Sequence, residues 1–152
     1  MKPLETREIM QIGIVVKDIE KSAVAYAKLF GMDMPNIRGA FPTITYRGQK
    51  ITTHSRLCSF PMGAISLELI QPDDGPSSWR EYLEEHGEGV HHVGLMVSDL
   101  DEAYASLSDM GIEKRQFGGA AWGSYTIMDS VDLGVLLNIK CAKPVAEGDG
   151  ND

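Results

Sequence analysis

Four polar side chains interrupt apolar, strand-like stretches of this sequence: Gln11, Glu68, His92 and Asn138. They comprise one imidazole, one carboxylate and two carboxamides, and each carries a lone pair that can bind a metal ion. Glu68 lies between Leu67 and Leu69. Burying a carboxylate without a partner is unfavourable, so this context favours a functional site. Gln11 and Asn138 leave an alternative open, because either amide can serve as a hydrogen-bonding group with no metal.

Two adjacent histidines lie near the start of the apolar stretch GVHHVGLMV (residues 89–97), which is typical of a buried strand. Neighbouring side chains of a strand point to opposite faces, so His91 and His92 cannot both serve one site. We expect His92 to face inward and His91 to face the other side, without a role. The alternative for His92 is a core histidine that a backbone group satisfies. His86 lies in a Glu-rich helical segment and is expected to be solvated.

An internal repeat aligns IMQIGIVVKDIEKS (residues 9–22) with VHHVGLMVSDLDEA (90–103) at a constant offset of 81 residues. Each copy is an apolar run that ends at an aspartate and continues as a helical pattern. Asp18 and Asp99 are therefore predicted N-caps. Three strand-like stretches follow each helix, so the chain is predicted to duplicate a βαβββ module.

The repeat predicts an α+β fold in which two tandem βαβββ modules pair and their curved mixed sheets enclose one cavity. The offset relates Gln11 to His92. The last strands of the modules, SLELI and LLNIK, align Glu68 with Asn138. A pseudo-two-fold axis between the modules would bring such equivalent positions face to face, so these two pairs are expected to meet in the cavity.

A single domain is expected to cover residues 1–152. Its parts are module one at about 8–71, a linker helix within 72–89, module two at about 90–141, and a tail at 142–152. The tail is polar and acidic and is expected to fray. Residues 39–50 have no counterpart in the second module, which indicates a loop insertion.

The stretch LELIQPDDGPSSWREYLEEHGEGVHHVGLMVSDLDEA (67–103) is similar to methylmalonyl-CoA epimerase and its relatives. The resemblance to the vicinal oxygen chelate superfamily extends over about residues 8–141. This superfamily also includes glyoxalase I, extradiol dioxygenases and the fosfomycin and bleomycin resistance proteins. The resemblance implies paired βαβββ modules with metal ligands on the first and last strand of each. Those positions land on the same four residues that the repeat selects.

The ligand set departs from that family at its last position. Epimerases of the family usually present His, Gln, His and Glu in chain order, and the final Glu is a ligand that acts as, or sits beside, the proton-transferring base. Asn138 cannot take up a proton at neutral pH. Rotated about the pseudo-two-fold axis, the epimerase set becomes His, Glu, His and Gln, which is close to the present set. The resemblance therefore makes Glu68 the candidate catalytic base, provided that burial raises its pKa.

Three functions follow from this reading. The first is a metal-assisted isomerase, epimerase or lyase that removes a proton α to a carbonyl of a small molecule, including an acyl-CoA. The second is a non-catalytic, resistance-type protein that binds a small molecule, which the missing second carboxylate favours. A ring-cleaving dioxygenase ranks last, because non-haem Fe(II) chemistry calls for two histidines and one carboxylate.

The donor set suits Mn²⁺, Mg²⁺, Co²⁺ or Ni²⁺ better than a structural zinc ion, which prefers Cys and His. With one anionic ligand, binding is expected to be weak, and the purified protein partly or wholly empty. Four further residues are candidates for substrate binding, although packing or a surface position is an open alternative for each: His54, Arg56, Trp122 and Tyr125.

Bulk properties narrow the class of partner. The net charge of −8 argues against nucleic acid, whose binding footprint is basic. We expect no membrane span and no signal peptide, because no stretch has the required apolar run. Cys58 and Cys141 belong to no CxxC pattern, which favours a reduced, cytoplasmic protein. A homodimer is expected, because sheet edges need cover.

Overall fold

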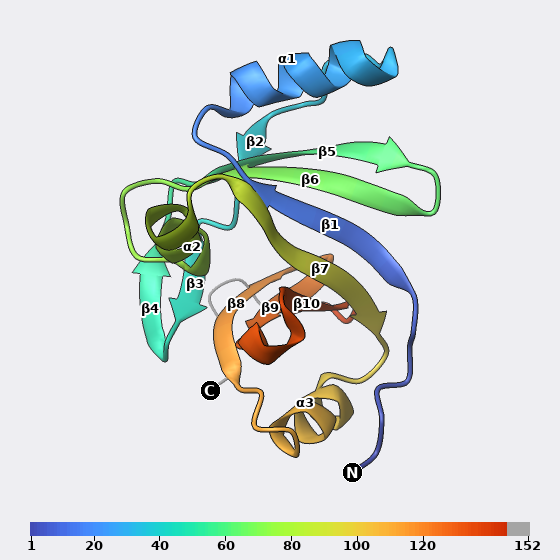
Figure 1. The fold of residues 1–152 in the computed structure, drawn as a ribbon. Helices are drawn as coiled ribbons and strands as arrows, with labels where there is room; N and C mark the ends of the chain where they lie inside the picture. Colours follow the sequence, from blue (N-terminus) through green and yellow to red (C-terminus); the bar gives the residue numbers. More distant parts are fainter. Residues whose placement is uncertain (146–152) are drawn as a thin grey trace.

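The computed structural model describes residues 1–145, whose strands form one curled, mixed sheet of ten strands (Figure 1). The strand order is β2-β5-β6-β1-β7-β10-β9-β8-β3-β4. The predicted α+β fold with a curled mixed sheet is confirmed. Residues 146–152, which include most of the tail expected to fray, lie outside the described part. In residues 1–145, no helix is long and apolar enough to cross a membrane.

Each half of the chain contributes one module. The first comprises β1 (Ile9–Val15), α1 (Ile19–Phe30), β2 (Arg38–Gly39), β3 (Thr43–Tyr46), β4 (Gln49–Thr52), β5 (Arg56–Met62) and β6 (Ile65–Gln71). The second comprises β7 (Gly89–Val97), α3 (Leu100–Ser108), β8 (Lys114–Ala120), β9 (Gly123–Met128), the 3₁₀ turn η1 (Val131–Leu133) and β10 (Leu136–Cys141). Helix α2 (Ser78–His86) connects them.

Both module helices begin at the predicted aspartates. Asp18 accepts the backbone N–H of Lys21, and Asp99 accepts that of Glu102, so each side chain satisfies one free donor of its helix. Helix α1 packs its buried residues against β5 and β6, and α3 packs against β10. The two helices therefore cover opposite ends of the curled sheet and leave its inner face to the candidate site (Figure 1).

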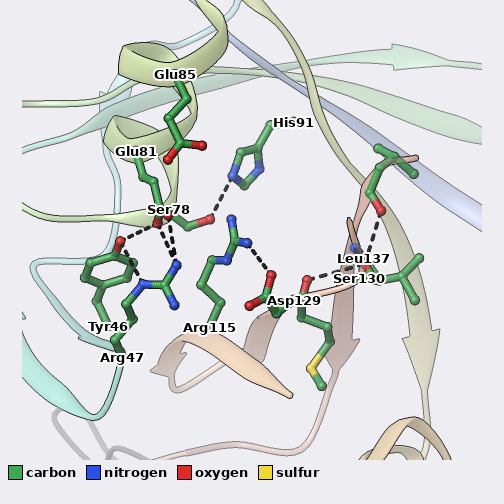
Figure 2. Close-up of polar contacts among 12 residues, drawn as sticks. Tyr46, Arg47, Ser78, Glu81, Glu85, His91, Arg115, Asp129, Ser130 and Leu137 are labelled. Atoms are coloured by element: carbon green, nitrogen blue, oxygen red, sulfur yellow. Dashed lines mark hydrogen bonds and ion pairs between the residues drawn. The ribbon is translucent and has the colours of Figure 1, made fainter. Parts of the chain in front are cut away.

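The insertion at 39–50 is not the loop that the sequence predicts. Much of it forms the hairpin β3–β4, and β3 pairs with β8 at the edge of the second module. Arg47 and Gly48 form its two-residue turn, both with positive φ (48° and 80°). Hairpin turns of this kind usually carry Asn-Gly or Asp-Gly. Because Arg47 stands at the first turn position, the sequence does not indicate a hairpin here. The hairpin brings Tyr46 and Arg47 to Glu81 of α2 (Figure 2).

The two modules meet along β1 and β7, which pair in antiparallel fashion about a pseudo-two-fold axis. Gln11 faces Gly94 across the pair, and Gly13 faces His92. A Cβ at Gly13 would overlap the imidazole of His92, and a Cβ at Gly94 would lie 2.8 Å from the Cβ of Gln11. Each glycine therefore leaves the space that the polar side chain of the other module occupies.

Candidate functional site

The structure brings Gln11, Glu68, His92 and Asn138 together on the inner face of the sheet. The amide nitrogen of Gln11 donates to Oε2 of Glu68 at 3.1 Å, and its Oε1 lies 3.0 Å from Nε2 of His92. Nδ2 of Asn138 donates to Oε1 of Gln11 at 3.3 Å. Oε1 of Glu68 lies 3.9 Å from Nε2 of His92.

Four central strands position these side chains. β1 and β6 run parallel with Gly13 beside Glu68, and β7 and β10 run parallel with Gly94 beside Asn138. The glycine of each first strand thus lies next to the polar residue of the corresponding last strand. Because the strands are tied on both sides, the four side chains are held by paired backbone.

The donor set fits a divalent cation. Ligands bound to one ion at about 2.1 Å lie about 3 Å apart when adjacent, close to the spacing between Gln11 and His92. Oδ1 of Asn138 is buried without a hydrogen-bond partner. A flip of this amide would turn that oxygen toward the other three candidate metal ligands. Residues 1–145 contain no cluster of three or more His, Cys, Asp or Glu, so a metal here would depend on the amides.

Burial sets the protonation of the two ionisable members. It raises the pKa of Glu68, an effect that the charges of Lys140 and Arg38 and the hydrogen bond from Gln11 oppose. Burial also lowers the pKa of His92 well below its ordinary value, and the neighbouring His91 and Lys140 lower it further. His92 is therefore neutral near pH 7 and keeps a lone pair for a metal ion or a proton.

The prediction that His91 and His92 face away from each other is wrong. Along β7 the pairing passes from His92 opposite Gly13 to Val90 opposite Ile14, which leaves His91 as the extra residue of a β-bulge. The two Nδ1 atoms lie 2.8 Å apart, and both side chains are fully buried. Alternation of side chains fails at a bulge, and the apolar pattern of the strand carries no sign of one.

A small cavity of about 20 Å³, room for about one water molecule, adjoins three of the four side chains. Its walls include Glu68, His92, Asn138, Phe41, Trp122, Tyr125 and Lys140. Phe41 packs against both aromatic residues, with ring centroids 5.7 Å from Trp122 and 4.6 Å from Tyr125. Two of the four predicted substrate-binding residues, Trp122 and Tyr125, therefore lie at the site.

The other two, His54 and Arg56, lie elsewhere. His54 is exposed after β4, and its backbone N–H donates to Asp73. Arg56 pairs with Glu20 of α1, because its place on β5 turns its side chain to the helix-covered face. His86 is exposed, as expected.

Sequence reasoning did not assign five of the residues that line this cavity to the site, among them Lys140 and Phe41. Lys140 follows Asn138 by two positions on β10, so strand alternation alone could have placed it on the same face. Its Nζ lies 5.4 Å from the centroid of the Trp122 ring. Phe41 lies between β2 and β3, and no periodicity identifies a loop residue that folds over a cavity.

Parts of this chain are similar in sequence to other proteins. The uncharacterised protein YqjC of Bacillus subtilis is 28% identical over 102 residues, which span 67% of this chain and 66% of that protein. 4-Hydroxyphenylpyruvate dioxygenase of Legionella pneumophila is 29% identical over 97 residues, 63% of this chain and 26% of the enzyme. The chain thus spans about two thirds of the first relative and about a quarter of the second.

Solved structures share the fold. Methylmalonyl-CoA epimerase from Mycobacterium tuberculosis superposes with a TM-score of 0.66 at 21% identity, covering 95% of this chain and 93% of that one. A methylmalonyl-CoA epimerase in complex with methylmalonyl-CoA and NH4+ gives a TM-score of 0.63 at 22% identity, covering 93% and 97%. At such identities the likeness concerns the fold alone.

The sequence profile of one superfamily matches residues 10–125, about three quarters of the chain. The matched range includes most of β1, all of β7 and three of the four convergent side chains, Gln11, Glu68 and His92. Since the profile covers well over half of the sequence and the paired modules agree with it, the chain belongs to the glyoxalase/bleomycin resistance protein/dioxygenase superfamily.

Proposed function

We propose that this protein is a metal-assisted isomerase, epimerase or lyase that removes a proton α to a carbonyl group of a small molecule. One observation carries the proposal: Glu68 is a largely buried carboxylate with a raised pKa that lies against Gln11 and His92. A raised pKa makes a carboxylate a stronger general base than an ordinary glutamate. Buried carboxylates of this kind are usually tied to function.

Gln11, Glu68, His92 and Asn138 would hold a divalent ion, which would supply Lewis-acid stabilisation of an enolate oxygen. Glu68 takes the proton from the α-carbon, and Gln11 orients the carboxylate by donating to its Oε2. The amide at Asn138 contributes an oxygen and no second base. Proton removal and return therefore both depend on Glu68.

Lys140 favours a substrate that carries or develops negative charge. Its ammonium group lines the cavity beside Trp122, and its charge reaches both Glu68 and His92. A cation in this place stabilises an enolate or a carboxylate. The neighbouring epimerase structure with methylmalonyl-CoA supports an acyl-CoA as one substrate to test. The cavity is small, so its walls must shift to admit any substrate.

The test is proton exchange in deuterated water. Wild-type protein with Co²⁺ or Mg²⁺ is incubated with acyl-CoA thioesters and 2-oxo acids, and loss of the α-proton signal is followed by NMR. We expect exchange with at least one compound and a loss of at least 100-fold in Glu68→Gln, since a positioned base contributes about 10²- to 10⁴-fold. Glu8→Gln, an exposed glutamate before β1, is the matched control and should keep full exchange. Undiminished exchange in Glu68→Gln would refute the assignment.

A second function, a non-catalytic small-molecule binder, is favoured by the amide at Asn138, which leaves the site with a single carboxylate. The same experiment separates the two functions, because a binder shifts the NMR signals of a compound without exchanging its protons. The homodimer and the cytoplasmic location stay predictions.

A further inference from the structure

A chain of hydrogen bonds leads from the candidate metal site to helix α2. It begins at Nε2 of His92, continues from Nδ1 of His92 to Nδ1 of His91 over 2.8 Å, and ends with Nε2 of His91 at 2.9 Å from Oγ of Ser78. All three side chains are buried. Figure 2 shows the imidazole of His91 turned toward Ser78.

The surroundings hold this chain in place. The backbone N–H of Ser78 donates to Oε1 of Gln116 at 2.7 Å, which fixes the first turn of α2. The ring of Tyr82 meets the edge of the His91 ring at a centroid distance of 5.5 Å. The bulge in β7 places the imidazoles of His91 and His92 within hydrogen-bonding distance of each other.

Proton counting fixes the direction of the chain when a metal is bound. His92 can offer Nε2 to a cation only as a lone pair, so its proton must lie on Nδ1. Two Nδ1 atoms 2.8 Å apart share a single proton, so His91 must accept there and carry its own proton on Nε2. Ser78 then accepts from His91. Each bond in the chain has one possible donor.

The metal-free protein favours the opposite direction. Oε1 of Gln11, 3.0 Å from Nε2 of His92, is only an acceptor, and Gln11 keeps this orientation because its amide nitrogen donates to Glu68. This oxygen is the nearer neighbour of Nε2, whereas Nδ2 of Asn138 lies farther away at 3.4 Å. His92 therefore carries its proton on Nε2, His91 donates from Nδ1, and Ser78 donates to His91. Each imidazole holds one proton in both states, so the reversal moves protons between ring nitrogens by exchange with water and releases none.

We propose that His91 and Ser78 are positioning residues for His92, and that metal binding reverses the hydrogen bonds of the His92–His91–Ser78 chain. The role rests on the metal site of the proposed function. A partner on the second nitrogen of a metal-bound histidine fixes its tautomer and ring orientation, and losing such a partner typically lowers metal affinity about 10- to 100-fold.

The first experiment reads the tautomers by ¹⁵N NMR of the imidazoles, without metal and with Zn²⁺, a diamagnetic ion that keeps the signals visible. We expect the proton of His92 to move from Nε2 to Nδ1 on metal addition and that of His91 from Nδ1 to Nε2. Identical tautomers in the two states would overturn the reversal. This readout needs no substrate, so it is independent of proton exchange.

The second experiment measures Ni²⁺ affinity by calorimetry. His91→Phe keeps a ring without an acceptor and should weaken binding about 10- to 100-fold, whereas His91→Asn places an oxygen near the former Nδ1 and should restore part of it. Ser78→Ala, a smaller change that keeps His91, should weaken binding less. Glu84→Gln, at an exposed residue of the same helix, is the control and should bind as wild type does.

The outcomes separate this inference from the proposed function. Wild-type affinity in folded His91→Phe or Ser78→Ala would overturn the positioning role and leave the metal site standing. A wild-type protein that binds no metal would overturn both. Tautomer reversal and weakened binding in the variants, together with no proton exchange by wild type, would support this inference and refute the enzymatic proposal.

Discussion

At the scale of single residues, the site depends on one carboxylate. A histidine and two amides are neutral near pH 7, so Glu68 alone supplies negative charge to a bound cation. Its burial raises the pKa, so Glu68 keeps its proton to a higher pH than an exposed glutamate does. Metal affinity and base strength are therefore linked through the same group.

This linkage predicts a pH dependence with a definite sign. Below the raised pKa of Glu68, a metal ion must displace its proton, so affinity should rise about tenfold per pH unit and level off above that pKa. In the metal-free protein, the free energy of unfolding should fall as pH rises from the ordinary value of 4.5 through the raised pKa, because the folded state holds the proton more tightly. Calorimetric Ni²⁺ titrations from pH 5 to 8 check the first effect. Glu68→Gln should lose the slope, and a flat profile in wild type would contradict the assignment.

At the scale of elements, the contact of β1 with β7 decides whether the site can form. Gly13 lies under the imidazole of His92, and any side chain there would overlap the ring. Gly13→Ala should therefore displace His92, weaken metal binding at least tenfold and destabilise the fold by about 1–3 kcal/mol, as overpacking usually does.

Gly39→Ala on β2 is the matched control, since its Cβ would meet no atom within 4 Å and the backbone there needs no positive φ. Calorimetry and thermal unfolding check both variants. Full metal affinity in Gly13→Ala would mean that His92 does not hold the position that the structure gives it.

Strand period and the repeat are regular features, and they suffice to predict the modules and the four polar positions. Strand period and the repeat do not predict irregular features of the fold. The bulge at His91 breaks the alternation that the prediction used, and Arg47 occupies a turn position where Asn or Asp would have revealed the hairpin β3–β4. Phe41 reaches the cavity from a loop, so its place depends on tertiary packing.

At the scale of the whole molecule, the duplicated modules share one site. The pseudo-two-fold axis places Gln11 and His92 on equivalent strands, and likewise Glu68 and Asn138, yet the members of each pair differ in chemistry. Position is thus symmetric, whereas the carboxylate of the site lies in module one and its imidazole in module two. Neither module alone holds both groups that the proposed reaction uses.

A cation bound by these four side chains would tie the two modules together and should stabilise the whole fold. A ligand at 100 times its Kd adds about 2.7 kcal/mol to the free energy of unfolding. For a chain of this size that corresponds to a rise in Tm of about 5–10 °C. Thermal unfolding with Ni²⁺ at that excess should show the rise, and EDTA should reverse it. Glu68→Gln should show a much smaller rise, because it removes the only anionic donor. An equal rise in Glu68→Gln would place the stabilising ion at another site and remove the link between the modules that the shared site requires.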